Sequence, residues 1–242
     1  MRIAVLILIC ASFAIAQQED ESVTAWKKLQ AEYNQASSEY YKPYDEARKK
    51  GESYILDRAS HPDLAFAPRY ARLAEEQVGT KGALSALGAL LRLRTPNTNY
   101  RGWALKTILT DYIESEWLAD VIFDIRNAPG PQRIAAYRVI AAKSPHPRVR
   151  GIALLQIGNL QKDEAPAEAL EALRRVLNEY ADEQYYRHWK QGPVAEGTIF
   201  EIEHLAVGMK APEIVGEDID GVPMKLSEFR GQVVLLDFWG DW

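Results

Sequence analysis

Residues 80–185 carry apolar side chains at helical spacing, and this periodicity constrains the fold of the chain more than any other feature. Breaks that contain proline interrupt it at 95–97, 129–131 and 144–147. Each run between two breaks has room for one or two amphipathic helices of ordinary length. We therefore predict six short helices: Lys81–Leu93, Tyr100–Ser115, Glu116–Arg126, Pro131–Lys143, Pro147–Leu160 and Ala165–Tyr180.

Part of the helical pattern is repeated within the sequence. Residues 101–108 match residues 150–157 at five of eight positions, and residues 133–140 repeat the pattern more faintly. A spacing of this order is close to that of HEAT-type repeats, in which helix pairs of about 40–47 residues stack. Gly102 and Gly151 occupy the second position of the motif, where a missing side chain would let neighbouring helices approach closely. We predict a mainly α-helical fold, either a bundle or a HEAT-like α-solenoid.

Two helical regions are predicted from these patterns. Residues 19–78 are polar and rich in Tyr, Glu and Lys, and we expect a helical hairpin there. Ser22 is placed to cap its first helix, and Pro43 suits the first turn of a second helix. Residues 80–190 would form the repeat-like domain that follows.

The N-terminus has the three parts of a secretory signal peptide over residues 1–16. Arg2 supplies a positive start, residues 3–13 are apolar, and residues 14–16 place small side chains before a cleavage point. We expect an exported protein, periplasmic or extracellular. An uncleaved signal segment acting as a membrane tether is the alternative.

Cysteine usage limits the chemistry of the processed chain. Cys10 is the single cysteine, and it lies inside the predicted signal. After cleavage the polypeptide would contain no disulfide, no thiolate nucleophile and no cysteine metal ligand.

Charge and motif content exclude several other classes of function. The formal net charge of −5 argues against general binding of nucleic acid, which favours a basic face. The histidines show no metal-binding spacing, and no glycine-rich phosphate loop or dinucleotide fingerprint is present. We therefore predict no metal, no cofactor and no nucleic-acid partner. His61 and His146 each adjoin proline in a turn, where we expect them to be solvated.

A dense aromatic and cationic cluster, Tyr185-Tyr186-Arg187-His188-Trp189, follows the predicted helices. We expect it to pack against the last of these helices, with binding of a partner as the alternative. The stretch 198–205 is a connector whose structure the pattern does not decide.

From Val207 the pattern changes to short strands. Asp220-Gly221 is a strong turn signal between residues 213–215 and residues 224–226, which predicts a β-hairpin. Ser227 could then cap a single helical turn that ends at Gly231.

The last part of the chain is its most apolar run outside the signal. Residues 233–238 read Val-Val-Leu-Leu-Asp-Phe, which suits a central strand buried on both faces. Trp239 and Trp242 follow this strand in the predicted loop.

Taken in order, these elements resemble a known family. The motifs are Gly208-x-x-Ala211-Pro212, Asp220-Gly221, Leu226-Ser227-x-x-x-Gly231 and a valine-rich strand ending in Phe238-Trp239. Residues 207–242 resemble the N-terminal third of redoxin domains of the AhpC/TSA group within the thioredoxin-fold superfamily. The pattern looks most like that of TlpA-like thiol-disulfide oxidoreductases. The resemblance implies the β-rich start of a thioredoxin-like α/β domain behind the helical region.

The resemblance also implies a function. It suggests an exported thiol-disulfide oxidoreductase or a thiol-dependent antioxidant, seen as a fragment whose Cys-x-x-Cys site would follow Trp242. Protein substrates bearing thiols or disulfides and an upstream thiol reductant would be its partners. The alternative is a non-catalytic helical interaction module with a vestigial redoxin tail. The oligomeric state stays open.

Two supporting site residues come from the same resemblance. Asp237 matches the buried acid beneath the active site, where it would exchange protons with the resolving cysteine. It could instead be a strand-end residue bonded to nearby backbone. Trp242 would lie beside the reactive cysteine and shape the substrate groove, or else pack in the core.

Overall fold

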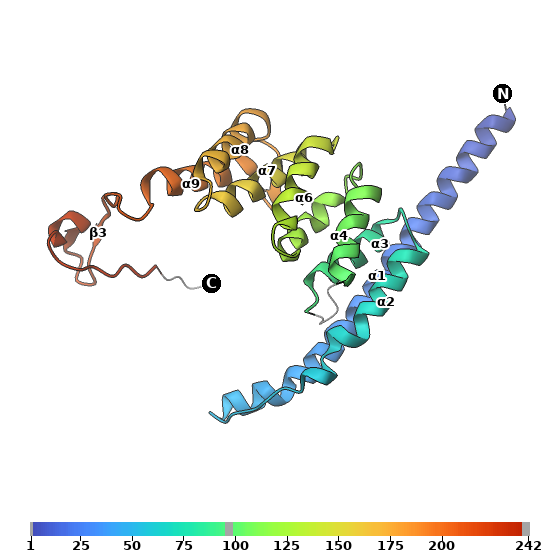
Figure 1. Ribbon diagram of the computed structural model, residues 1–242, viewed down its shortest axis with the longest axis horizontal. Coiled ribbons are helices and arrows are strands. Elements are labelled where there is room, and N and C mark those ends of the chain that lie inside the picture. The colour runs from blue at the N-terminus through green and yellow to red at the C-terminus, as the bar shows by residue number, and fades with distance from the viewer. Residues whose placement is uncertain (1, 95–98, 239–242) are drawn as a thin grey trace.

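The computed structural model describes residues 2–94 and 99–238, with side chains from residue 21 onward. This part of the chain is mainly helical, as predicted (Figure 1). Its α-helices are α1 (Arg2–Lys49), α2 (Pro62–Glu76), α3 (Lys81–Arg92), α4 (Asn99–Asp111), α5 (Leu118–Val121), α6 (Gln132–Lys143), α7 (Pro147–Gln161), α8 (Pro166–Glu179) and α9 (Gln191–His204). The short elements are the 3₁₀ helices η1 (Arg58–Ser60), η2 (Ile122–Asn127) and η3 (Leu226–Phe229), and the strands β1 (Gln184–Tyr186), β2 (Trp189–Lys190), β3 (Val215–Glu217) and β4 (Pro223–Lys225).

The helices pack mostly on their neighbours in sequence. Helix α1 lies along α2 and α3, and further along the chain α6 contacts α7, α7 contacts α8 and α8 contacts α9. Figure 1 shows the shorter helices stepping away from the long α1, with α9 at the far end. One cluster of buried apolar side chains runs from Leu29 on α1 to Ala195 on α9. We call residues 21–204, which contain this core, the helical body.

Proline and threonine set the starts of several helices. Proline occupies the first turn of α2, α7 and α8, where its missing N–H has no intrahelical partner to lose. The Thr80 hydroxyl accepts a hydrogen bond from the Ala83 N–H at 3.2 Å and caps α3. The predicted helix over residues 116–126 is divided into α5 and η2. At the junction, the buried Tyr137 hydroxyl donates to the Ile122 carbonyl, an acceptor that a continuing α-helix would use itself.

The N-terminal region differs from the prediction at two residues. Pro43 does not begin a second helix but lies inside α1, which continues to Lys49. Proline removes one backbone hydrogen bond there, and the helix tolerates this on its exposed C-terminal part. Ser22 does not cap the start of its own helix either. It lies within α1, where its hydroxyl accepts a hydrogen bond from the N–H of Gly82, at the start of α3.

The two glycines of the repeated motif, Gly102 and Gly151, have different surroundings. A Cβ on Gly151 would lie 1.8 Å from Gln191 Oε1 and 2.8 Å from Tyr180 Cβ, so α7 does meet its neighbours closely there. A Cβ on Gly102 would meet nothing within 4 Å. The prediction of close approach is therefore confirmed at Gly151 and wrong at Gly102, and the HEAT-like repeat stays a prediction.

The aromatic cluster forms a small hairpin rather than packing on the last predicted helix. Strands β1 and β2 pair antiparallel, with Arg187 in the left-handed region (φ 52°) at the turn. The Tyr185 ring packs edge-on against Phe123 of η2, with ring centroids 5.3 Å apart. Tyr186 and Trp189 stay half exposed. The connector at 198–205, left undecided by the sequence, lies almost wholly within α9.

The two turn histidines are engaged rather than solvated. The His146 Nε2–H donates to the Glu114 carbonyl at 2.8 Å, and both histidines are partly buried. The contacts of His61 are described below. Among the described residues, no helix has the length and apolar character needed to cross a membrane.

Candidate functional site

The C-terminal segment, residues 207–238, contains the predicted hairpin. Strands β3 and β4 are antiparallel, with Val215 opposite Lys225 and Glu217 opposite Pro223. The Gly221 N–H donates to the Asp218 carbonyl, and Gly221 adopts a left-handed φ of 79°. The hairpin is therefore confirmed, with a turn over Asp218–Gly221 in which glycine supplies the conformation that other residues resist.

Side-chain carboxylates of the C-terminal segment stabilise the hairpin by accepting hydrogen bonds from backbone N–H groups. The Asp218 carboxylate accepts from the N–H groups of Asp220 and Val222, both at 2.9 Å. The Glu213 carboxylate accepts from the N–H of Ser227 at 2.9 Å, and hydrogen bonding from Ser227 lowers the pKa of this exposed Glu213. Both contacts are local, because each joins residues of the same short segment.

The predicted helical turn is present, but its cap is different. Helix η3 begins at Leu226, and the Glu228 carboxylate accepts from the Lys225 N–H at 3.2 Å. Ser227 lies inside the turn, so it is not the cap. Gly231 ends the turn with a φ of 86°, as predicted.

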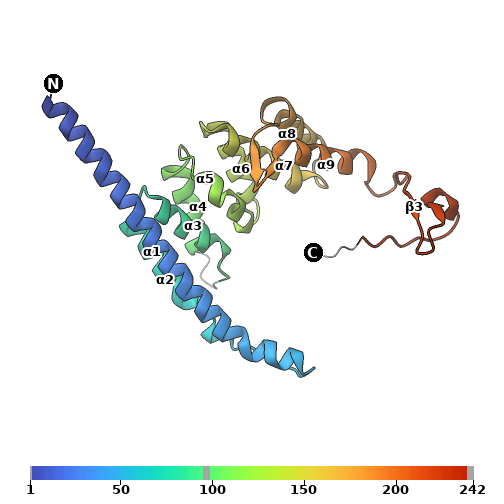
Figure 2. The same ribbon diagram turned by 180° about the vertical axis from the view of Figure 1, so that it is seen from behind.

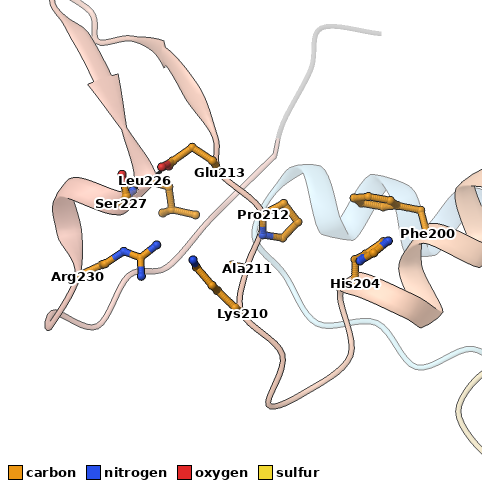
Figure 3. A pocket seen from close by; sticks show the side chains of 9 residues that line it. All are labelled: Phe200, His204, Lys210, Ala211, Pro212, Glu213, Leu226, Ser227 and Arg230. Atoms are coloured by element: carbon orange, nitrogen blue, oxygen red, sulfur yellow. Dashed lines mark hydrogen bonds between the residues drawn. The ribbon is translucent and has the colours of Figure 1, made fainter.

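A cleft of about 580 Å³ lies between the end of α9 and the C-terminal segment (Figure 3). Phe200 and His204 form its helical side, with ring centroids 4.8 Å apart. Lys210 and Arg230 reach into it from the segment, with Pro212 between the two sides (Figure 3). Two cations beside an aromatic wall can hold an anionic group. The sequence pattern did not indicate this cleft, because residues 198–205 were not assigned to a helix.

The expected central strand is not formed. Residues 233–238 run extended without strand pairing among the described residues, as the chain leaving η3 in Figure 2 shows. Val233 and Leu235 are fully or almost fully exposed, at 104% and 93%. A central strand needs partner strands and a covered face, and the described chain places neither beside this run. The prediction of a buried strand is wrong for this structure.

Of the two predicted site residues, only Asp237 lies among the described residues. It is exposed on the unpaired run, and its role as a buried acid stays a prediction. Trp239 and Trp242 lie outside the described residues. The single cysteine of the sequence, Cys10, lies at the opposite end of the chain. From residue 21 to residue 238, outside the gap at 95–98, no three His, Cys, Asp or Glu side chains gather as metal ligands.

The comparisons with known proteins give short, local similarities. The chain is 36% identical over 47 residues to the thiol-disulfide oxidoreductase ResA of Bacillus thuringiensis subsp. konkukian, covering 19% of this chain and 27% of that protein. It is 45% identical over 38 residues to ResA of Geobacillus thermodenitrificans and 47% identical over 38 residues to ResA of Geobacillus kaustophilus, each covering 16% of this chain and 22% of that protein.

The chain thus spans about a quarter of the length of these curated relatives. No protein-family model matches the chain. No solved structure matches it either. The likeness that these comparisons support is therefore a local one, to thiol-disulfide oxidoreductases and at the level of a thioredoxin-like redoxin.

Proposed function

We propose that the chain carries the first part of a TlpA-like thiol-disulfide oxidoreductase domain behind a helical body. One structural observation supports this proposal most directly. The three glycines of the redoxin-like motifs all adopt left-handed φ values: 89° at Gly208, 79° at Gly221 and 86° at Gly231. Each motif glycine thus occupies a turn that other residues disfavour. The local similarity to thiol-disulfide oxidoreductases supports the same reading.

The proposed chemistry is thiol-disulfide exchange at a Cys-x-x-Cys pair after Trp242. The first thiolate attacks one sulfur of a substrate disulfide, that S–S bond breaks, and the displaced sulfur takes a proton. The second cysteine then attacks the mixed disulfide, which releases the second substrate thiol and leaves the Cys-x-x-Cys pair oxidised. An upstream thiol reductant returns the pair to its reduced form.

Asp237 has a defined part in this proposal. In a complete redoxin domain, residues 233–238 would be covered as a central strand and the Asp237 carboxyl would lie beneath the cysteine pair. The carboxyl could then exchange a proton with the resolving cysteine. Its exposure in the present structure belongs to the uncovered state of this strand.

The coding sequence downstream of codon 242 provides the first test. An in-frame Cys-x-x-Cys is expected, and the encoded protein should reduce insulin disulfides in the presence of dithiothreitol. Asp237→Asn should slow this turnover and change its pH profile, whereas Asp218→Asn, in the hairpin loop, should leave the pH profile unchanged. A downstream sequence without a cysteine pair, or a full-length protein inert towards insulin, would overturn the proposal.

Export is part of the proposal and has its own test. The motif of residues 1–16 supports cleavage before Gln17. Expression with the native N-terminus in a Gram-negative host, followed by mass spectrometry of the periplasmic fraction, should find Gln17 as the first residue. Protein that keeps Met1 and stays with the membrane would favour the tether instead.

A non-catalytic interaction module is the second candidate, and one observation favours it. The buried apolar core lies wholly within the helical body, while the described residues 207–238 contain no buried residue. The body therefore has what a separate domain needs. Residues 17–204 expressed alone should unfold cooperatively by circular dichroism, and a broad melt would count against an independent module.

A further inference from the structure

A second, larger cleft lies in the helical body, where the C-terminal part of α1 meets the start of α2. It has a volume of about 740 Å³, which is in the range of ligand-binding clefts. Its walls are three tyrosines, three aliphatic side chains, one histidine and two arginines: Tyr40, Tyr41, Tyr54, Ile55, Leu56, Leu64, His61, Arg58 and Arg94. Figures 1 and 2 show this end of the α1–α2 pair away from the C-terminal segment.

His61 contacts two of the three tyrosines that line this cleft, Tyr40 and Tyr41. Its Nδ1 accepts a hydrogen bond from the Asp63 N–H at 3.2 Å and caps α2. In the neutral ring Nε2 then carries the proton, and it lies 3.0 Å from the Tyr41 hydroxyl oxygen. The Tyr40 ring stands nearly edge-on to the His61 ring at 4.9 Å, and its hydroxyl donates to the Asp57 carbonyl at 2.9 Å. Two tyrosine rings are thus held in place before any ligand arrives.

A buried carboxylate holds the arginine side of the cleft. Asp63 is 3% exposed, and its oxygens accept from the Tyr33 hydroxyl at 2.8 Å and from the Arg94 N–H at 2.6 Å. Burial raises the pKa of the Tyr33 hydroxyl, so this group remains a donor to Asp63. The Arg94 backbone is therefore tied to the start of α2, which places its side chain at the cleft.

The charged side chains that line the cleft, Arg58 and Arg94, are both cationic. None of its lining residues is Asp or Glu, although the chain as a whole carries a net charge of −5. Within the part of the chain that the structure describes, no carboxylate forms an ion pair with Arg58 or Arg94. The three arginines of α2 and α3 are paired: Arg69 with Glu32, Arg72 with Glu76 and Arg92 with Asp124.

We propose that this cleft binds an extended acidic segment of a partner polypeptide. The two unpaired guanidinium groups suit carboxylates, which arginine binds through paired hydrogen bonds. The tyrosine rings offer flat apolar faces with polar tips, a surface that takes proline and aromatic side chains. Two arginines do not make the extended basic face that a nucleic acid favours, so a polypeptide is the better occupant. This inference does not depend on the redox proposal, since no cysteine takes part in it.

Fluorescence anisotropy of the full chain with labelled peptides tests the inference. A probe of about eight residues that combines Glu, Pro and Phe should bind in the micromolar range, and more weakly as salt rises. The same peptide with Lys in place of Glu should not bind. The double variant Arg58→Gln, Arg94→Gln should weaken binding by roughly tenfold or more. Arg72→Gln, on the same helix pair but outside this cleft, should not change it.

Several outcomes would overturn the inference. One is equal binding of the acidic and basic peptides, and another is an affinity that the double variant leaves unchanged. Tighter binding of a single-stranded oligonucleotide would assign the cleft to nucleic acid instead. Binding of benzoate as tight as that of the peptide would make it a small-molecule site. Because both arginine side chains are exposed, the double variant should keep the circular dichroism spectrum and melting temperature of the wild type.

Discussion

The helical body and the C-terminal segment are both rich in apolar residues, yet they bury them very differently. Leucines, isoleucines and alanines of α3 and α7 are almost fully enclosed. In the segment, Val207, Ile219 and Val233 are fully exposed. The body is stabilised by packing between elements, whereas the segment is held by hydrogen bonds among its own residues. Short-range hydrogen bonds and turn glycines can thus define a hairpin without the core that would normally accompany it.

Hydrogen exchange gives the largest expected contrast between the two regions. Amides within α3 and α7 should exchange only through opening of the body, roughly a thousandfold or more slower than an unstructured chain. Amides of residues 233–238 should exchange without protection, because they are unpaired and exposed. Mass spectrometry of peptic fragments would measure both. Protected amides at 233–238 would break the comparison by showing a paired strand in solution.

A matched pair of leucine substitutions sharpens the contrast in energy. Leu87→Ala, at a fully buried position of α3, should lower the free energy of unfolding by about 2–5 kcal/mol. Leu235→Ala, at a position that is 93% exposed, should change it by less than about 0.5 kcal/mol. Urea unfolding followed by circular dichroism measures both. Equal losses would mean that Leu235 is buried in solution.

Within the helical body, Gly102 and Gly151 of the repeated motif allow a second matched pair of substitutions. Gly151→Ala would force a Cβ against Gln191 and Tyr180 and should cost about 1–3 kcal/mol. Gly102→Ala has open space on α4 and should stabilise the protein by about 0.5–1 kcal/mol, since alanine favours the helix. Thermal melts would show opposite shifts. A common sign would indicate that the two positions are structurally equivalent after all.

The smallest expected effect is on the pH dependence of folding stability. Burial raises the pKa of Asp124 above its ordinary value of 3.8, with Arg92 opposing the shift. A carboxyl with a raised folded-state pKa favours the folded protein while protonated. That contribution is lost as pH rises from 3.8 through the folded-state pKa. Relative to Asp124→Asn, the wild type should therefore lose stability over this window. Asp120→Asn, an exposed carboxylate paired with Lys81, is the control and should follow the wild type.

Most helix positions were predictable because proline and threonine mark their starts. The 147–160 prediction and α7 agree within one residue, and 81–93 matches α3 equally well. The errors have physical causes that sequence periodicity does not contain. Proline ends a helix only where the loss of one backbone hydrogen bond is not tolerated, and Pro43 lies inside α1 without ending it. The division between α5 and η2 coincides with a hydrogen bond from the Tyr137 hydroxyl, which comes from another part of the fold.

The candidate sites were less predictable. The redoxin-like motifs gave the hairpin and the turn at Gly231, but Asp237 and Trp242 depend on tertiary neighbours that local pattern does not supply. The cleft lined by Tyr40, Tyr41 and Tyr54 was missed because it joins the end of α1 to the start of α2 and to Arg94, which follows α3. A signal did exist in the sequence: a histidine placed to cap a helix start at 61–63, downstream of closely spaced tyrosines.

The hydrogen bond from the Gly82 N–H to the Ser22 hydroxyl has a practical consequence for shortening this protein. Residues 60 positions apart meet there, and the first helix supplies an acceptor that the third helix needs. A chain begun at Thr80 would leave that N–H without its partner and would uncover the face of α3 that packs on α1. The latest safe starting point for expressing the helical body therefore lies before Ser22, even though the repeating pattern begins near residue 80.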